Sequence, residues 1–227
     1  MIAARVFFFL RVLVRLQSHE VFTGYLYNRS VSELDVSVKA SCAAGDFRGA
    51  ARDAVVAYGE EVYTFVLARV RDEDVAGDVF AQACEDLLSS LSTFEWRCSL
   101  RTWFYRLARS AAARYLRTPN NRAERRVALS EVSEVAAQVR SRTVAHMRSE
   151  VKDGVRALRD QLDADEQQLL MLRIDRDLGW DEIAEILSDS ELDARELQRA
   201  SARLRQQFQK LKDRLRELAI AEGLLDG

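Results

Sequence analysis

Turn-forming residues are scarce in this chain, and their scarcity restricts its fold more than any other feature. The 227 residues include one proline and nine glycines, too few for the many tight turns of a strand-rich protein. Apolar residues recur at spacings of three and four through most of the chain, which is the period of an amphipathic helix. Hydrophobic residues make up 48% of the chain, so a core can form. The sequence therefore predicts an all-α protein.

Composition and motifs argue against catalysis. Cys42, Cys84 and Cys98 are odd in number and far apart, and His19 and His146 are isolated, so we expect reduced cytoplasmic thiols and no zinc site. A Cys–His nucleophile pair stays open as an alternative. The sequence shows no Gly-rich phosphate loop and no nucleophile elbow. We therefore expect a non-enzymatic, cytoplasmic protein with no cofactor, no metal and no small-molecule substrate.

The first thirty residues differ from the rest of the chain. Their apolar runs, Val6–Leu10 and Val12–Val14, are interrupted by arginine. A membrane span needs about 20 apolar residues, and arginine at mid-bilayer costs about 2.5–3.5 kcal/mol. We expect no membrane partner. A surface amphipathic helix is one alternative; we favour an N-terminal extension, residues 1–30, upstream of a true start near Val31.

Arginine is concentrated in the segment that follows residue 96. Nine arginines and one acid, Glu124, lie between Arg97 and Arg126, although the whole chain has a net charge of −2. At 100° per residue, Leu100, Phe104, Leu107 and Ala111 form a buried side, and the opposite side carries arginine with small residues. A solvated face usually mixes both signs, so we favour nucleic acid. The candidate residues are Arg97, Arg101, Tyr105, Arg106, Arg109, Ala113 and Arg117.

An acidic helix precedes this basic one. Its predicted apolar stripe consists of Val75, Val79, Phe80, Ala83, Leu87 and Leu91. Another face of the same helix carries Asp74, Asp78, Gln82 and Glu85. From the residues alone, a solvated face is favoured over a docking surface for a basic partner.

The clearest break in the chain is Thr118–Arg126, which contains the only proline and no apolar run. We expect two helical domains, residues 31–117 and 144–227, joined by a linker, residues 118–143. A short helix, Ser130–Val139, is expected inside the linker. A longer amphipathic helix is expected after it, with Val144, Met147, Val151, Val155, Leu158 and Leu162 on one face.

The last segment has an acidic half and a basic half. Twelve acids lie between Asp160 and Asp193, and eight bases lie between Arg195 and Arg216. The pattern predicts a helix at Asp165–Ile174, a turn, a short helix at Trp180–Leu187, a polar connection and a long helix.

The long helix is predicted to begin with a capping box formed by Asp193 and Glu196. This order is that of a helix-turn-helix, whose second helix enters the major groove of DNA. A plain helical hairpin with a solvated basic face is almost equally compatible. The candidate base-reading residues are Arg195, Gln198, Arg199, Ala202, Arg203 and Gln206.

Two segments resemble a known family. "SLRTWFYRLARSAAARYLR", residues 99–117, and "LGWDEIAEIL", residues 178–187, are similar to regions 2 and 4 of the extracytoplasmic-function (ECF) class of bacterial sigma factors, the specificity subunits of RNA polymerase. Three positions depart from the family pattern: Gln82 stands one place late, Ser110 replaces the usual Asn, and Arg114 replaces a common Asp. The connection Ser188–Leu192 is also longer than usual.

The resemblance implies a role for each face. Asp74, Asp78, Gln82 and Glu85 would bind the RNA polymerase core. The basic helix and the turn Phe94–Ser99 would recognise the −10 promoter element and hold a flipped base, and the last helix would read the −35 element. The linker would run toward the RNA exit path, and an anti-sigma factor is a further candidate partner. The rival interpretations are a stand-alone helix-turn-helix regulator that acts without polymerase, and a helical scaffold.

Overall fold

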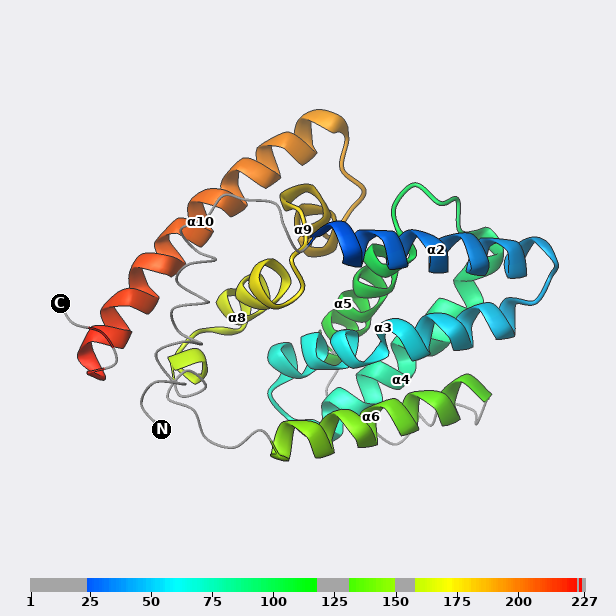
Figure 1. Cartoon of the computed structure of the whole chain (residues 1–227), viewed down its shortest axis with the longest axis horizontal. Helices are drawn as coiled ribbons and strands as arrows, with labels where there is room; N and C mark the ends of the chain where they lie inside the picture. Colours follow the sequence, from blue (N-terminus) through cyan, green and yellow to red (C-terminus); the bar gives the residue numbers. More distant parts are fainter. Residues whose placement is uncertain (1–23, 118–130, 150–157, 224, 226–227) are drawn as a thin grey trace. The chain divides into compact units, whose positions relative to one another are not determined.

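The structure is a computed structural model that describes residues 24–117, 131–149, 158–223 and 225. Within these ranges the chain forms helices and no strands, which confirms the predicted all-α fold (Figure 1). The described residues fall into two compact units, one mainly before and one mainly after residue 149. None of the helices in the described part contains an apolar stretch that could cross a bilayer.

The first unit is arranged around one central helix. It contains α2 (Gly24–Ala43), α3 (Phe47–Val70), α4 (Glu73–Ser90), α5 (Leu100–Arg117) and α6 (Glu131–Ser149). α3 packs against α2, α4, α5 and α6. Aromatic and branched side chains fill the space between these helices, and the fully buried ones include Val62, Tyr63, Phe65, Phe80, Leu87, Leu100 and Phe104.

Polar residues set the ends of these helices. Asp46 accepts a hydrogen bond from the backbone N–H of Gly49 at the start of α3, and Asp72 accepts from Asp74 and Val75 at the start of α4. Such caps satisfy N–H groups that have no partner within the helix. Arg71 ends α3 with a left-handed backbone, φ 56°. Arg71 and Asp72 therefore define the turn between α3 and α4.

The predicted stripe of α4 is confirmed. All of its members are buried: Val75, Val79, Phe80, Ala83, Leu87 and Leu91. A short 3₁₀ turn, Leu91–Thr93, follows α4 and leads into the connection to α5.

The segment that we expected to be a linker differs from the expectation where the structure describes it. Residues 131–149 form one continuous helix, α6, with no break between Val139 and Val144. α6 packs along α3 and α4 and belongs to the first unit. Its buried residues, Val132, Ala136, Val139 and Thr143, recur at spacings of four, three and four. The short helix expected at Ser130–Val139 and the beginning of the next one, from Val144 to Ser149, therefore belong to a single helix.

Other parts of that expectation lie outside the described residues. Residues 118–130 and 150–157 are not described, and neither are residues 1–23. Leu158 and Leu162, the last members of the expected amphipathic face, are buried in the second unit. At the other end, α2 begins at Gly24, before the expected domain start at Val31.

The second unit contains α8 (Ala164–Leu170), a π-helical turn (Met171–Asp175), α9 (Trp180–Leu187) and α10 (Ala194–Ala221). The bounds of α9 are those predicted. The predicted capping box at the start of α10 is confirmed, with Asp193 and Glu196 each accepting a backbone hydrogen bond of the other. Asp163 and Glu166 form a second capping box at the start of α8.

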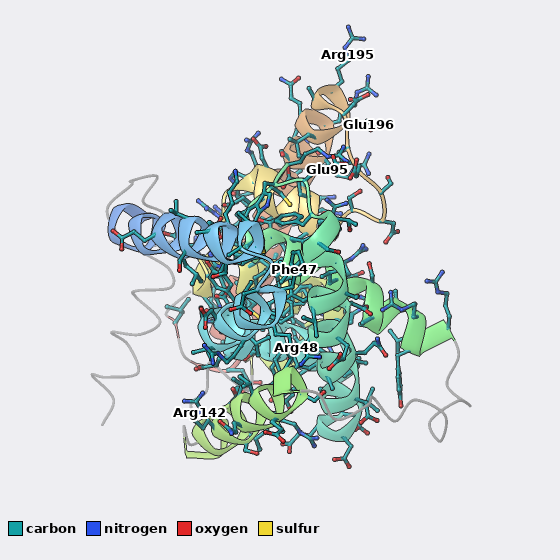
Figure 2. The ribbon with its side chains drawn as sticks, turned by 90° about the vertical axis from the view of Figure 1, so that its right-hand side faces the viewer. Phe47, Arg48, Glu95, Arg142, Arg195 and Glu196 are labelled. Carbon is teal, nitrogen blue, oxygen red and sulfur yellow. The ribbon has the colours of Figure 1, made fainter. Side chains whose placement is uncertain are left out.

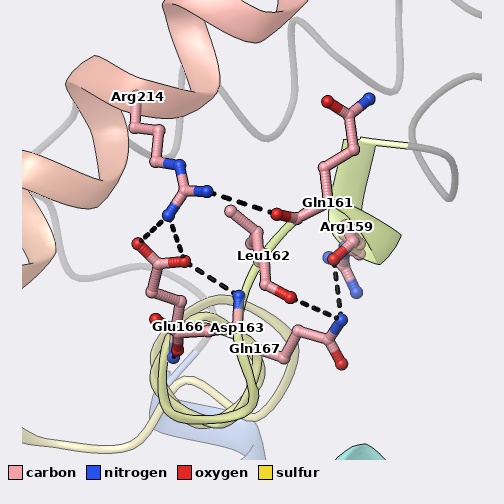
Figure 3. A network of polar contacts seen from close by, with 7 residues as sticks. All are labelled: Arg159, Gln161, Leu162, Asp163, Glu166, Gln167 and Arg214. Carbon is pink, nitrogen blue, oxygen red and sulfur yellow. Dashed lines mark hydrogen bonds and ion pairs between the residues drawn. The ribbon is translucent and has the colours of Figure 1, made fainter.

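A polar network joins α10 to the start of α8 (Figure 3). Arg214 on α10 donates to both carboxylate oxygens of Glu166 at 2.7 Å and to the carbonyl of Gln161 at 3.3 Å. Gln167 donates to the carbonyls of Arg159 and Leu162. Glu166 thus caps α8 and binds α10 at once, which fixes the second half of α10 against the rest of the unit.

Candidate functional site

The acidic face of α4 consists of Asp74, Asp78, Gln82 and Glu85. Asp74 and Asp78 are exposed, and Gln82 and Glu85 are half-buried. Two of the four are bound by α6: Arg140 pairs with Asp74 at 3.2 Å, and the Ser133 hydroxyl donates to Glu85 at 2.8 Å. The Asp74 side chain nevertheless remains 97% exposed, so this ion pair is strongly screened by solvent.

Gln82 of that face leads to a contact that the sequence did not reveal. The Gln82 amide donates to Asp86 at 2.9 Å, and Asp86 also pairs with the guanidinium of Arg114 on α5. Asp86 therefore joins the acidic helix to the basic one. The wheel of either helix alone could not show this contact, because the two partners are 28 positions apart.

Arg101 is not a surface residue, contrary to the prediction. Its guanidinium donates to both carboxylate oxygens of Glu61 on α3, at 2.6 and 2.7 Å. The side chains of Arg101 and Glu61 are only 5% and 6% exposed. Arg101 is therefore removed from the DNA-contacting set, and its role is to hold α5 against α3.

Tyr105 is a second correction. It is fully buried, and its ring meets Phe65 of α3 edge to face, with 5.1 Å between ring centroids. Thr102, next to Arg101 on the same helix, is also buried, and its hydroxyl is bonded to that of Ser99. The prediction failed because it gave α5 one buried side, whereas α5 packs against both α3 and α4.

The other basic candidates of α5 reach the surface. Arg97 and Arg117 are exposed, and Arg106, Arg109 and Ala113 are half-buried. Arg106, Arg109, Ala113 and Arg117 follow one another at spacings of three and four, so they lie along one side of the helix. The Arg106 guanidinium lies over the ring of Trp103, with 5.5 Å to the centroid. This arrangement presents cations with apolar flanks, a surface suited to nucleic-acid phosphates and bases.

Three aromatic rings gather just before and within the first turn of α5. Phe94 stacks on Trp103 with 5.3 Å between centroids and contacts Trp96 at 4.8 Å. Trp103 also donates from Nε1 to the Ser90 hydroxyl at 3.1 Å, and it is half-buried. Phe94 and Trp96 are half-buried as well.

Trp96 has an unusual backbone, with φ 59°. A non-glycine residue seldom adopts this left-handed conformation. The Nζ atom of Lys39 lies 5.6 Å from the centre of the Trp96 ring. A partly open aromatic cluster flanked by Lys39 and Arg106 can stack an unpaired base while its cations meet the backbone.

The face of α10 that we predicted to read DNA is free of core packing. All six candidates are exposed: Arg195, Gln198, Arg199, Ala202, Arg203 and Gln206. Figure 2 shows Arg195 projecting from the first turn of the helix. The opposite face is anchored, since Leu204 and Phe208 are buried and Ser201 donates to Asp181 of α9 at 2.5 Å.

The start of α9 helps to hold α10. Trp180 meets Phe208 edge to face, with 5.4 Å between ring centroids, and the guanidinium of Arg173 lies over the Trp180 ring, 4.9 Å from its centroid. The exposed face of α10 is thus oriented by contacts on its buried side.

Two of the three cysteines have raised thiol pKa values. Cys84 is fully buried, and burial raises its pKa well above the ordinary thiol value. Burial and the nearby Asp46 carboxylate raise the pKa of Cys42. Both shifts disfavour the thiolate that a nucleophile needs. Among the described residues, no group of three or more His, Cys, Asp or Glu side chains is placed to bind a metal.

Comparison with known families identifies the helical segment that carries the acidic and basic faces. Residues 54–122 match the family model of sigma-70 region 2. The match spans most of α3 and all of α4 and α5, and it supports a sigma-70 family factor. Comparison with curated proteins and with solved structures finds no match.

Proposed function

We propose that this chain is a sigma factor of the ECF class that directs RNA polymerase to promoters. The observation that carries the proposal is the coincidence of two features in residues 54–122. This segment matches sigma-70 region 2, and it ends in a helix whose surface side is lined by Arg106, Arg109 and Arg117. We assign this side of α5, with Arg97 and Ala113, to the −10 element.

The aromatic cluster is the proposed site for a flipped base. The centroid of the Phe94 ring lies 4.8 Å from that of Trp96 and 5.3 Å from that of Trp103, and Lys39 and Arg106 flank the two tryptophans. Stacking on an aromatic ring returns about 1–3 kcal/mol per base. The cluster is beside the first turn of α5, so a base held there would extend the DNA path along the arginine side.

The acidic face of α4 is the proposed contact with the polymerase core. Asp78 is its exposed centre, with Asp74, Gln82 and Glu85 around it. Because the chain carries a net charge of −2, its general affinity for DNA should be weak without a partner, since such affinity comes from phosphate neutralisation.

The second unit is the proposed region 4 domain, in which α9 and α10 act as a helix-turn-helix on the −35 element. The exposed arginines and glutamines of α10 match the donors that read guanine and adenine in the major groove. The connection between the helices, residues 188–193, is longer than a usual turn of three to four residues. The recognition angle is therefore set by the Ser201–Asp181 and Phe208–Trp180 contacts rather than by a tight turn.

Energetics explain why a polymerase is needed. A bubble of about ten base pairs gives up more than 10 kcal/mol of stacking, at about 1.4 kcal/mol per step. Capture of one or two bases returns about 1–3 kcal/mol each. The chain can therefore nucleate an opening, and the polymerase must sustain it.

The exposed face of α10 also favours a second candidate, a helix-turn-helix regulator that binds DNA without polymerase. Binding of the full chain to a pool of genomic fragments, with and without core polymerase, separates the two. The sigma-factor proposal predicts sequence-selective retention of fragments only when core is present. Equally selective retention without core would favour the stand-alone regulator.

A further inference from the structure

α6 lies along α3 and α4 (Figure 1). We call the surface of α3 and α4 that contacts α6 its seat. The seat contains two glycines in the middle of helices, Gly59 on α3 and Gly77 on α4. A Cβ atom at Gly77 would lie 2.3 Å from Nη1 of Arg140, and one at Gly59 would lie 3.0 Å from Cγ1 of Val139. Glycine destabilises a helix interior relative to alanine. α3 and α4 therefore each contain a helix-destabilising glycine where α6 packs against them.

The inner side of α6 is packed like a core element. Val132, Ala136 and Val139 are 1–3% exposed. The outer side carries exposed polar residues, among them Glu134, Gln138 and Arg142. Figure 2 shows Arg142 on α6 with its side chain directed away from the helix.

The polar contacts of α6 fall on the acidic face of α4. Arg140 pairs with Asp74 at 3.2 Å, and Ser133 donates to Glu85 at 2.8 Å. These two carboxylates lie on either side of Asp78, which stays exposed. α6 therefore satisfies two of the four side chains that a basic partner of this face would need.

We infer that α6 is an intramolecular competitor for the surface of α4 that binds the polymerase core. The inference rests on the proposed function, because it takes the acidic face as the core-binding surface. While α6 is in place, Glu85 accepts from Ser133 and Asp74 is paired with Arg140, although the Asp74 side chain itself stays 97% exposed. Core binding draws on the fraction of molecules in which Arg140 and Ser133 have released these carboxylates, so the apparent affinity is lowered by that fraction.

Variants that loosen the seat test the competition. Gly77→Ala places a methyl group where the Arg140 guanidinium lies, and Arg140→Ala removes that guanidinium; neither alters a carboxylate of the acidic face. Arg142→Ala is the matched control, because Arg142 is an exposed arginine of the same helix. We expect the first two variants to bind core polymerase about 3- to 10-fold more tightly than the wild type, and Arg142→Ala to be unchanged.

A reversible lock gives the opposite change. Gly59→Cys with Val139→Cys introduces two thiols at facing positions, because a Cβ added at Gly59 would lie 3.0 Å from Cγ1 of Val139, within reach of a disulfide. The oxidised protein should bind core more weakly than the same sample after reduction. Thermal melts of each variant confirm that the domain remains folded.

The outcomes separate the two claims. If the Gly77→Ala and Arg140→Ala variants bind core polymerase no more tightly than the wild type, or more weakly, the proposed competition is wrong. If Asp78→Arg weakens core binding while the lock has no effect, the core-binding surface stands and the competition alone fails. If wild type and all variants fail to bind core, the proposed function fails and the competition falls with it.

Discussion

Arg101 of α5 and Glu61 of α3 are joined by two hydrogen bonds of 2.6 and 2.7 Å inside the first unit. Both are charged residues in an interior filled mainly by aromatic and aliphatic side chains. The pair fixes the rotation of α5 about its axis, and that rotation decides which arginines reach the surface. The basic face of α5 thus depends on an arginine that is not part of it.

Removal of one member of this pair should destabilise the domain strongly. We expect Arg101→Ala to lower the free energy of unfolding by about 3–5 kcal/mol, because it leaves Glu61 buried without its partner. Arg101→Met with Glu61→Leu should recover most of that loss, since no charge is then buried. Urea denaturation followed by circular dichroism measures both. A direct DNA-contacting role for Arg101 would instead leave the stability of the single variant unchanged.

Charge reversal on the exposed side of α5 should abolish initiation without affecting assembly. Arg109→Glu with Arg117→Glu should reduce promoter-directed transcription by at least about 10-fold, given about 1–3 kcal/mol per arginine contact. Core binding, measured in parallel by co-purification, should stay at the wild-type level. Arg48→Glu with Arg52→Glu introduces the same charge change at exposed sites of α3 and should leave transcription intact. Loss of core binding in the α5 variant would show that this side meets the polymerase.

Asp78→Arg should have the reverse effect. Reversing the exposed centre of the acidic face should weaken core binding by about 10-fold or more, because like charges then oppose each other across the interface. Asp160→Arg, at an exposed site of the second unit, is the matched control and should bind normally. A titration of labelled protein with core provides the dissociation constants. Equal affinities for both variants would argue against the α4 assignment.

Substitutions on α10 should act on the −35 element alone. Arg199→Ala and Gln206→Ala should each cost about 1–3 kcal/mol of discrimination at one base position. Arg216→Ala, two to three turns beyond Gln206 on the same helix, should preserve the preference. Transcription from promoter libraries randomised at −35 gives the preference directly. An unchanged profile for both substitutions would remove the base-reading role of this face.

Asp35 gives a pH-dependent test of the α2–α5 junction. Burial raises the pKa of Asp35, and the hydrogen bond from the Leu100 N–H only partly offsets this. Asp35 therefore ionises less readily in the folded protein than in the unfolded chain. The contribution of its protonated form to the free energy of unfolding is present at low pH and is lost as the pH rises through the pKa of the folded state. Asp35→Asn should melt at a higher temperature than wild type at pH 7, and the difference should shrink toward acid pH. A constant difference at all pH values would show that ionisation is not the cause.

The sequence was sufficient where one helix face packs against one partner. The stripe from Val75 to Leu91, the bounds of α9 and the capping box of Asp193 and Glu196 all follow from local spacing. Local spacing could not show that Arg101 and Tyr105 are buried. A charged residue and a phenol were expected at the surface, and α5 packs against other helices on two sides rather than one. The ion partner of Arg101 is 40 residues away, and nothing in the local sequence pairs them.

The packing of α6 escaped prediction for a related reason. The only proline marks the end of the preceding segment, and a boundary placed there separates α6 from the helices that it covers. The clues to its seat are Gly59 and Gly77, which are informative only once the partner helix is known. The match to sigma-70 region 2 covers residues 54–122, so α6 lies beyond that match.

If α5 engages promoter DNA while α4 is bound to the polymerase core, run-off transcription on genomic fragments must depend on both the chain and the core. Purified chain, core polymerase and fragments from its own genome are combined, and transcript starts are mapped with each component omitted in turn. Our account predicts discrete starts that require both the chain and core, and that vanish with Arg109→Glu plus Arg117→Glu. A chain that does not associate with core, or that associates and yields no specific start on any fragment, would contradict it.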